Sequence, residues 1–238
     1  MLSAVFPEGE DFFVRSVRAY RDQITDPVLK EQVKGFIGQE ALHGRQHRDF
    51  NDRLQRLGYP THLVDRRTKT GLALLHRVAP KSVQLAVTAA LEHYTATLAE
   101  TLLRHPDARA EFATPETEAL FTWHALEETE HKAVAYDVFQ HVSGNDVVRI
   151  GTMAAVHVGF LLAMAATVTH SLVLDKAARN PLRLAKSLWR LRTHPFFTRE
   201  VVRRLADYNR RDFHPDDHDT EALLDEWREW WQEAGYAA

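Results

Sequence analysis

The sequence predicts an all-α fold, a four-helix bundle followed by additional C-terminal helices. Two observations indicate this class. The 238 residues contain no run in which Val, Ile and Thr alternate with polar residues, which is the pattern of a half-buried strand. Apolar residues instead recur at steps of three and four through several long segments, which is the spacing of one face of an α-helix.

Turn signals containing Pro or Gly divide the first part of the chain. We expect helices at 10–24, 27–57, 81–104 and 115–142. The segment 61–78, a polar stretch followed by a short apolar piece, is a long connection between the second and third helices. One long connection among short ones is the topology of a ferritin-like bundle.

Acidic and imidazole side chains lie on the apolar stripes of these four helices. The first and third helices each carry one glutamate, and the second and fourth each carry a Glu-x-x-His pair, which is the ligand inventory of a carboxylate-bridged two-metal centre. A Glu and a His at i and i+3 can reach one ion. Without cations, burying these carboxylates would cost several kcal/mol each. The predicted metal ligands are Glu10, Glu40, His43, Glu92, Glu128 and His131.

Two further histidines lie one helical turn from this set. We predict catalytic roles for His47 and His124 as proton carriers, with an extra ligand role or a structural hydrogen bond as open alternatives. Glu100, two turns after Glu92, is the substitute ligand if the third helix has a different register.

Composition excludes several classes of protein. There is no cysteine, so disulfides, zinc–thiolate sites, iron–sulfur clusters and cysteine nucleophiles are excluded. The net charge of −3 argues against a nucleic-acid partner. The apolar start, Met1 to Phe6, is too short for a leader, so we expect a cytoplasmic protein.

The second part of the chain, residues 146–238, contains an apolar helix followed by basic and acidic helices. Residues 150–174 are apolar enough for a transmembrane helix, and eleven Lys and Arg lie between Lys176 and Arg211. A single span would place residues 1–145, the predicted dimetal bundle, outside the cell without a leader. We therefore favour a packed helix or a membrane-embedded edge, with membrane contact through residues 150–192 at the inner face.

Several segments resemble the bacterial family of predicted metal-dependent hydrolases, and together they cover nearly the whole chain. The resemblance implies a ferritin-like helical fold with a dimetal site. The segments are Phe6-Pro7-Glu8-Gly9-Glu10-Asp11-Phe12-Phe13, Gly38-Gln39-Glu40-Ala41-Leu42-His43, Leu91-Glu92-His93-Tyr94-Thr95-Ala96, Trp123-His124-Ala125-Leu126-Glu127-Glu128-Thr129-Glu130-His131-Lys132 and Phe213-His214-Pro215-Asp216-Asp217.

Three functions are compatible with such a site. The favoured one is oxidation of a small apolar or lipid-like substrate by dioxygen at two divalent ions, for which Fe, Mn or mixed Fe/Mn suits carboxylates with one imidazole per metal. The first alternative is a dimetal hydrolase that activates water against an ester or phosphoester. The second is a non-catalytic metal-storage or scaffold protein. A homodimer remains open.

Overall fold

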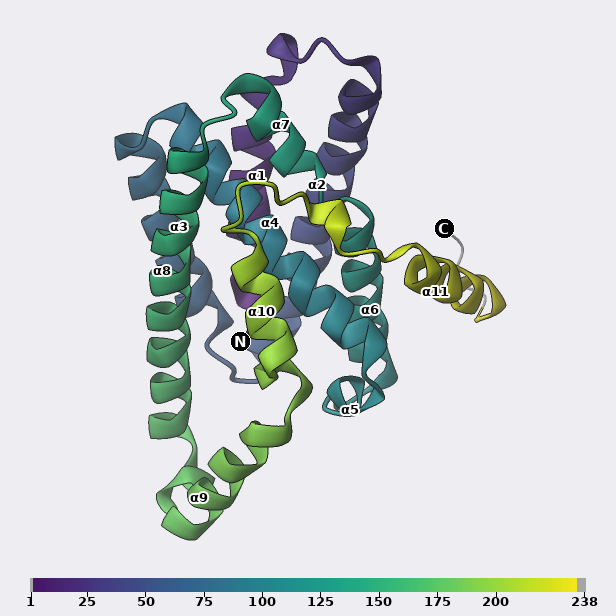
Figure 1. Cartoon of the computed structure of the whole chain (residues 1–238). Helices are drawn as coiled ribbons and strands as arrows, with labels where there is room; N and C mark the ends of the chain where they lie inside the picture. Colours follow the sequence, from purple (N-terminus) through teal and green to yellow (C-terminus); the bar gives the residue numbers. More distant parts are fainter. Residues whose placement is uncertain (1, 235–238) are drawn as a thin grey trace. The chain divides into compact units, whose positions relative to one another are not determined.

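The computed structural model describes residues 2–234, apart from the side chains of residues 174, 176 and 177, and this part of the chain is helical without any strand (Figure 1). The all-α prediction is therefore confirmed. The α-helices are α1 Phe6–Arg18, α2 Pro27–Arg56, α3 Thr61–Val78, α4 Lys81–Arg104, α5 Pro106–Arg109, α6 Pro115–Glu130, α7 Val134–Val142, α8 Asp146–Leu174, α9 Pro181–Arg190, α10 Arg199–Asp207 and α11 Glu221–Glu233.

The chain divides into two compact units. The first comprises Met1–Glu92 and His131–Thr152, and the second comprises His93–Glu130 and Met153–Ala238. Helices α4 and α8 therefore contribute residues to both units.

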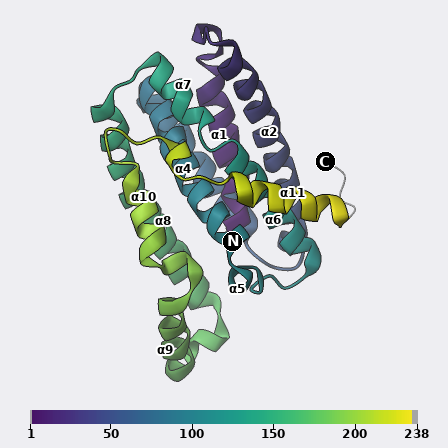
Figure 2. The ribbon, with the colours of Figure 1, turned by 45° about the vertical axis from the view of Figure 1, so that its right-hand side comes forward.

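In the first unit, α1 and α2 run side by side, α3 packs on both, and α7 packs on α2 (Figures 1 and 2). The core contains Phe12, Val17, Val33 and Phe36, each no more than 1% exposed. Asp26 caps α2 by accepting hydrogen bonds from the backbone N–H groups of the first turn. The long, capped α2 thus presents one face to α1 and the other elements of this unit.

Several helix predictions differ from the structure. Helix α1 spans Phe6–Arg18 rather than 10–24, and it begins earlier because a proline suits the first turn of a helix, where its missing N–H is not needed. The predicted connection 61–78 is one continuous helix, α3. The predicted helix 115–142 is broken by a turn at 131–133 into α6 and α7. This break puts a predicted metal ligand, His131, outside regular helix.

The second unit has an apolar cluster between α4, α6 and α11. It includes Ala99, Leu102, Leu126, Leu223 and Trp227. The amphipathic helix α11 therefore buries its apolar face inside this unit.

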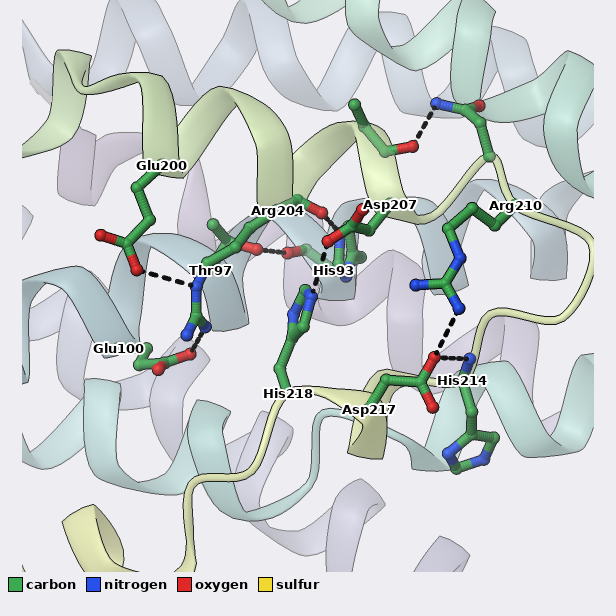
Figure 3. A network of polar contacts seen from close by, with 12 residues as sticks. His93, Thr97, Glu100, Glu200, Arg204, Asp207, Arg210, His214, Asp217 and His218 are labelled. Atoms are coloured by element: carbon green, nitrogen blue, oxygen red, sulfur yellow. Dashed lines mark hydrogen bonds and ion pairs between the residues drawn. The ribbon is translucent and has the colours of Figure 1, made fainter.

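A polar network joins α10 to α4 within the second unit (Figure 3). Arg204 on α10 forms an ion pair with Glu100 on α4, and Asp207 is 3.1 Å from His218 Nε2. The imidazole of His93 lies 5.9 Å from that of His218, measured between ring centroids, and donates a hydrogen bond to the backbone carbonyl of Arg204. These side chains fix α10 against α4.

Helix α8 begins four residues earlier than predicted because Asn145 caps it, accepting hydrogen bonds from the backbone N–H groups of Val147 and Val148. Among the described residues it is the one helix long and apolar enough to cross a membrane, judged by length and composition. Only 11% of its most apolar 18-residue stretch is buried. Within the described part of the chain, α8 is therefore not covered on all sides.

Candidate metal centre

Three predicted ligands come together in the first unit. Glu40 on α2, Glu92 on α4 and His131 at the turn after α6 each offer one donor atom, and these donor atoms lie within 4.8 Å of one another. His131 Nε2 is 3.1 Å from Glu40 Oε1 and 3.5 Å from Glu92 Oε2. All three residues are at most 3% exposed. Two carboxylates and one imidazole thus converge in a buried environment.

The imidazole of His131 is held on its other side by Gln39. His131 Nδ1 and Gln39 Oε1 are 3.1 Å apart, and because the amide oxygen only accepts, Nδ1 is the donor. In the neutral ring this leaves a lone pair on Nε2, the nitrogen that faces the two carboxylates. The ring of Phe36 packs edge-on against the imidazole, with centroids 4.9 Å apart. Metal-binding histidines are commonly oriented in this way by a second hydrogen bond.

The surroundings of the Glu40 carboxylate indicate whether a cation fits this group. Both of its carboxylate oxygens are buried, and neither accepts a hydrogen bond from any residue in the described part of the chain. A buried carboxylate without such a donor is costly. A divalent ion beside Glu40, Glu92 and His131 would offset that cost, so the residues present fit a metal.

Glu10 and His43 lie in the same unit and are both buried. His43 Nδ1 is 3.6 Å from Glu40 Oε1, and its ring centroid is 6.0 Å from that of His131. A Cβ added to Gly44 would stand 3.4 Å from Glu10 Oε2. The glycine therefore lets the Glu10 carboxylate from α1 approach the backbone of α2 closely.

His124 and Glu128 lie on α6 in the second unit. Both are at most 4% exposed, and His124 Nε2 is 2.8 Å from Glu128 Oε1. Their i, i+4 spacing puts the two side chains on one face of the helix. The imidazole therefore positions one oxygen of this carboxylate.

The remaining candidates have other partners. The Nδ1 of buried His47 is 2.7 Å from Ser3 Oγ, and its ring packs on Phe6. Glu100 pairs with Arg104 and Arg204 and is not needed as the substitute ligand. Sequence reasoning missed Gln39, although its place beside Glu40 in the Gly-Gln-Glu segment was the available signal.

Fold and site together define an all-helical protein with buried carboxylate–imidazole groups able to hold a metal ion. The chain belongs to the family described as predicted metal-dependent hydrolase, whose model matches residues 1–219. Searches of curated proteins and of solved structures found no match.

Proposed function

We propose that this protein is a metal-dependent hydrolase that activates water against an ester or phosphoester. The observation that carries the proposal is the buried group of Glu40, Glu92 and His131, with the His131 ring oriented by Gln39. Membership of the predicted metal-dependent hydrolase family supports hydrolysis over oxidation.

We further propose a ferritin-like bundle with two metal positions. Glu40, Glu92 and His131 would hold the first ion. Glu10 and His43 in the first unit would supply a second ion with one carboxylate and one imidazole. The burial of Glu10 and His43 and the suitability of their donor atoms support this second position. The ligand role of Glu128 and the proton-carrier role of His124 stay predictions.

Bound divalent ions would supply Lewis acidity, lowering the pKa of a water and polarising the scissile ester or phosphoester. The chain's own residues prepare the site for this chemistry. Gln39 keeps the Nε2 lone pair of His131 aimed at the carboxylates, and Phe36 covers one side of the ring. The His124 imidazole is hydrogen-bonded to Glu128. It can hold a proton at Nε2, the ring nitrogen that faces this carboxylate.

Oxidation by dioxygen is the second candidate. The specific observation in its favour is the donor set, carboxylate oxygens with imidazole nitrogen and no sulfur, which suits Fe and Mn as well as Zn. If the protein is an oxidase or oxygenase, we expect its substrate to be apolar or lipid-like.

Metal content and activity separate these functions. Full-length protein would be stripped with a chelator, reloaded separately with Fe²⁺, Mn²⁺ or Zn²⁺, and assayed by mass spectrometry for bound metal. Each form would then be tested on carboxylic esters, phosphomonoesters and phosphodiesters, and the Fe²⁺ form for oxygen uptake.

The matched variants are E40Q at the site and E31Q, an exposed position on the same helix. Hydrolysis that requires metal, is lost in E40Q and persists in E31Q supports the proposal. Oxygen uptake without hydrolysis would shift the function to oxidation. Tight metal binding with neither activity would leave a storage or scaffold role and overturn the proposal.

A further inference from the structure

One face of α8 is apolar and uncovered. From residue 150 to 174 the sequence contains no Asp, Glu, Lys or Arg. Five large apolar side chains along this stretch are 45–70% exposed, where a folded protein ordinarily covers most such residues. At about 100° per residue they lie within an arc of about 140°, and so on one side of the helix: Val158, Leu161, Leu162, Val168 and Val173. We call these five residues the α8 strip.

Along the first half of α8, the opposite face packs on its own chain. Met153 is fully buried, and His157 shares a hydrogen bond between its Nδ1 and Tyr94 Oη on α4. The ring of Phe160 packs on Tyr94 with centroids 4.7 Å apart. Because protein covers this side, the first half of the helix cannot be surrounded by lipid. The α8 strip is thus available to a surface rather than to a full bilayer crossing.

Helix α9, in the same unit, is a second uncovered amphipathic element. None of its residues is buried, although the structure describes them all. Leu182, Leu188 and Trp189 are 81%, 53% and 66% exposed on one side. Arg183 and Lys186 lie on the other, at a three-residue step. An exposed helix with leucine and tryptophan on one side and basic residues on the other is typical of interfacial membrane binding.

The positive charge that follows α8 in the sequence indicates which kind of partner the α8 strip binds. Residues 176–192 contain six Lys or Arg and no Asp or Glu, although the whole chain has a net charge of −3. Each basic residue near an anionic bilayer contributes about 1 kcal/mol of attraction. A two-fold contact between copies of this chain would instead bring two such basic segments toward each other.

We propose that the α8 strip and α9 dock on an anionic lipid bilayer, with both helices lying in one leaflet and neither crossing it. The apolar residues of the α8 strip enter the acyl region of the leaflet. The basic residues of α9 contact the lipid head groups, and Trp189 lies at the depth of the head groups. The proposal does not depend on the reaction catalysed.

Vesicle flotation of the full-length protein tests this docking. The probes are vesicles of phosphatidylcholine alone and of phosphatidylcholine mixed with phosphatidylglycerol. Wild-type protein should float with the mixed vesicles, and less so as salt is raised. K186Q/R190Q should bind about 20- to 30-fold more weakly, the equivalent of two head-group contacts. L161E/L162E should bind weaker by on the order of 100-fold or more.

The control is V202E, which changes an exposed valine on α10 in the same unit and should bind like wild type. Circular dichroism would establish that each variant is folded. Brominated lipid should quench the fluorescence of wild-type protein more than that of W189F, which reports the depth of α9.

Three results would overturn the proposal. One is the absence of flotation, or flotation that neither double variant weakens. Another is sedimentation showing that L161E/L162E turns a dimer into a monomer while neither form binds vesicles, which makes the strip a contact between copies. The third is resistance of membrane-bound protein to alkaline carbonate extraction, which indicates a helix that crosses the bilayer.

Discussion

The imidazole of His93 donates a hydrogen bond through Nε2 to the backbone carbonyl oxygen of Arg204, and the two atoms are 2.8 Å apart. His93 directly follows Glu92 on α4, and successive side chains leave a helix about 100° apart. Neighbouring residues thus serve different purposes: Glu92 belongs to the candidate metal centre, and His93 anchors α10 (Figure 3).

The His93 contact predicts acid sensitivity. Burial, opposed by the bond to the Arg204 carbonyl and reinforced by nearby His218, lowers the pKa of His93 from 6.5 to about 4. The unfolded chain therefore binds more protons between these values. This effect on the free energy of unfolding is absent above pH 6.5. As the pH falls from 6.5 to about 4, the folded state loses about 3 kcal/mol of stability relative to the unfolded chain.

Urea unfolding across that pH range, with chelator present, measures this effect. The free energy of unfolding of H93Q should fall less steeply with decreasing pH than that of wild type, because glutamine keeps an N–H donor but does not titrate. Equal slopes for the two proteins would show that His93 is not the group responsible.

Replacing Glu40 should affect metal-free and metal-loaded protein in opposite senses. E40Q removes a buried charge, so we expect the metal-free variant to be at least as stable as wild type. Added metal should raise the Tm of wild type, since ligand at 100 times its Kd adds about 2.7 kcal/mol, but should raise that of E40Q much less. Calorimetry with and without metal measures both. An unchanged metal response in E40Q would contradict the ligand assignment, and E31Q is the control.

Gln39 should set the affinity for metal without being a ligand. Q39L removes the acceptor for His131 Nδ1, so the ring loses its fixed orientation, and we expect metal affinity to fall about 10- to 100-fold. Q39E, which restores an acceptor, should recover most of it. Titration calorimetry with Mn²⁺ or Zn²⁺ measures the change; full affinity in Q39L would mean that the His131 ring is oriented by packing on Phe36 alone.

The ion pair between Arg204 and Glu100 should contribute to stability. Their side chains are 18% and 6% exposed, so water screens the pair little. R204M should lower the free energy of unfolding by about 2 kcal/mol, less than the 3–5 kcal/mol typical of breaking a buried pair, because Arg104 still faces Glu100. R203M, at the exposed neighbouring position, should change it by less than about 0.5 kcal/mol. Similar losses for both would indicate a general effect of altering α10.

Much of the helical organisation could be predicted from local signals. Pro27, Lys81 and Pro115 begin helices where the caps and prolines indicated, because such signals act within a few residues. The break at 131–133 could not be predicted in this way. Nothing in the local residues forbids a continuous helix there, and the turn exists only in the folded chain.

The sequence by itself determined the all-α class and the kinds of donor atom available for a metal, since both follow from residue types at helical spacing. Only the tertiary structure decided which donors meet. Glu40 groups with Glu92 and with His131 of the other Glu-x-x-His pair, because the helix packing and the turn at 131 set where each ring nitrogen points. Tertiary structure likewise decided that the apolar α8 is covered on one side alone, because burial depends on the elements that pack against a helix and not on its own composition.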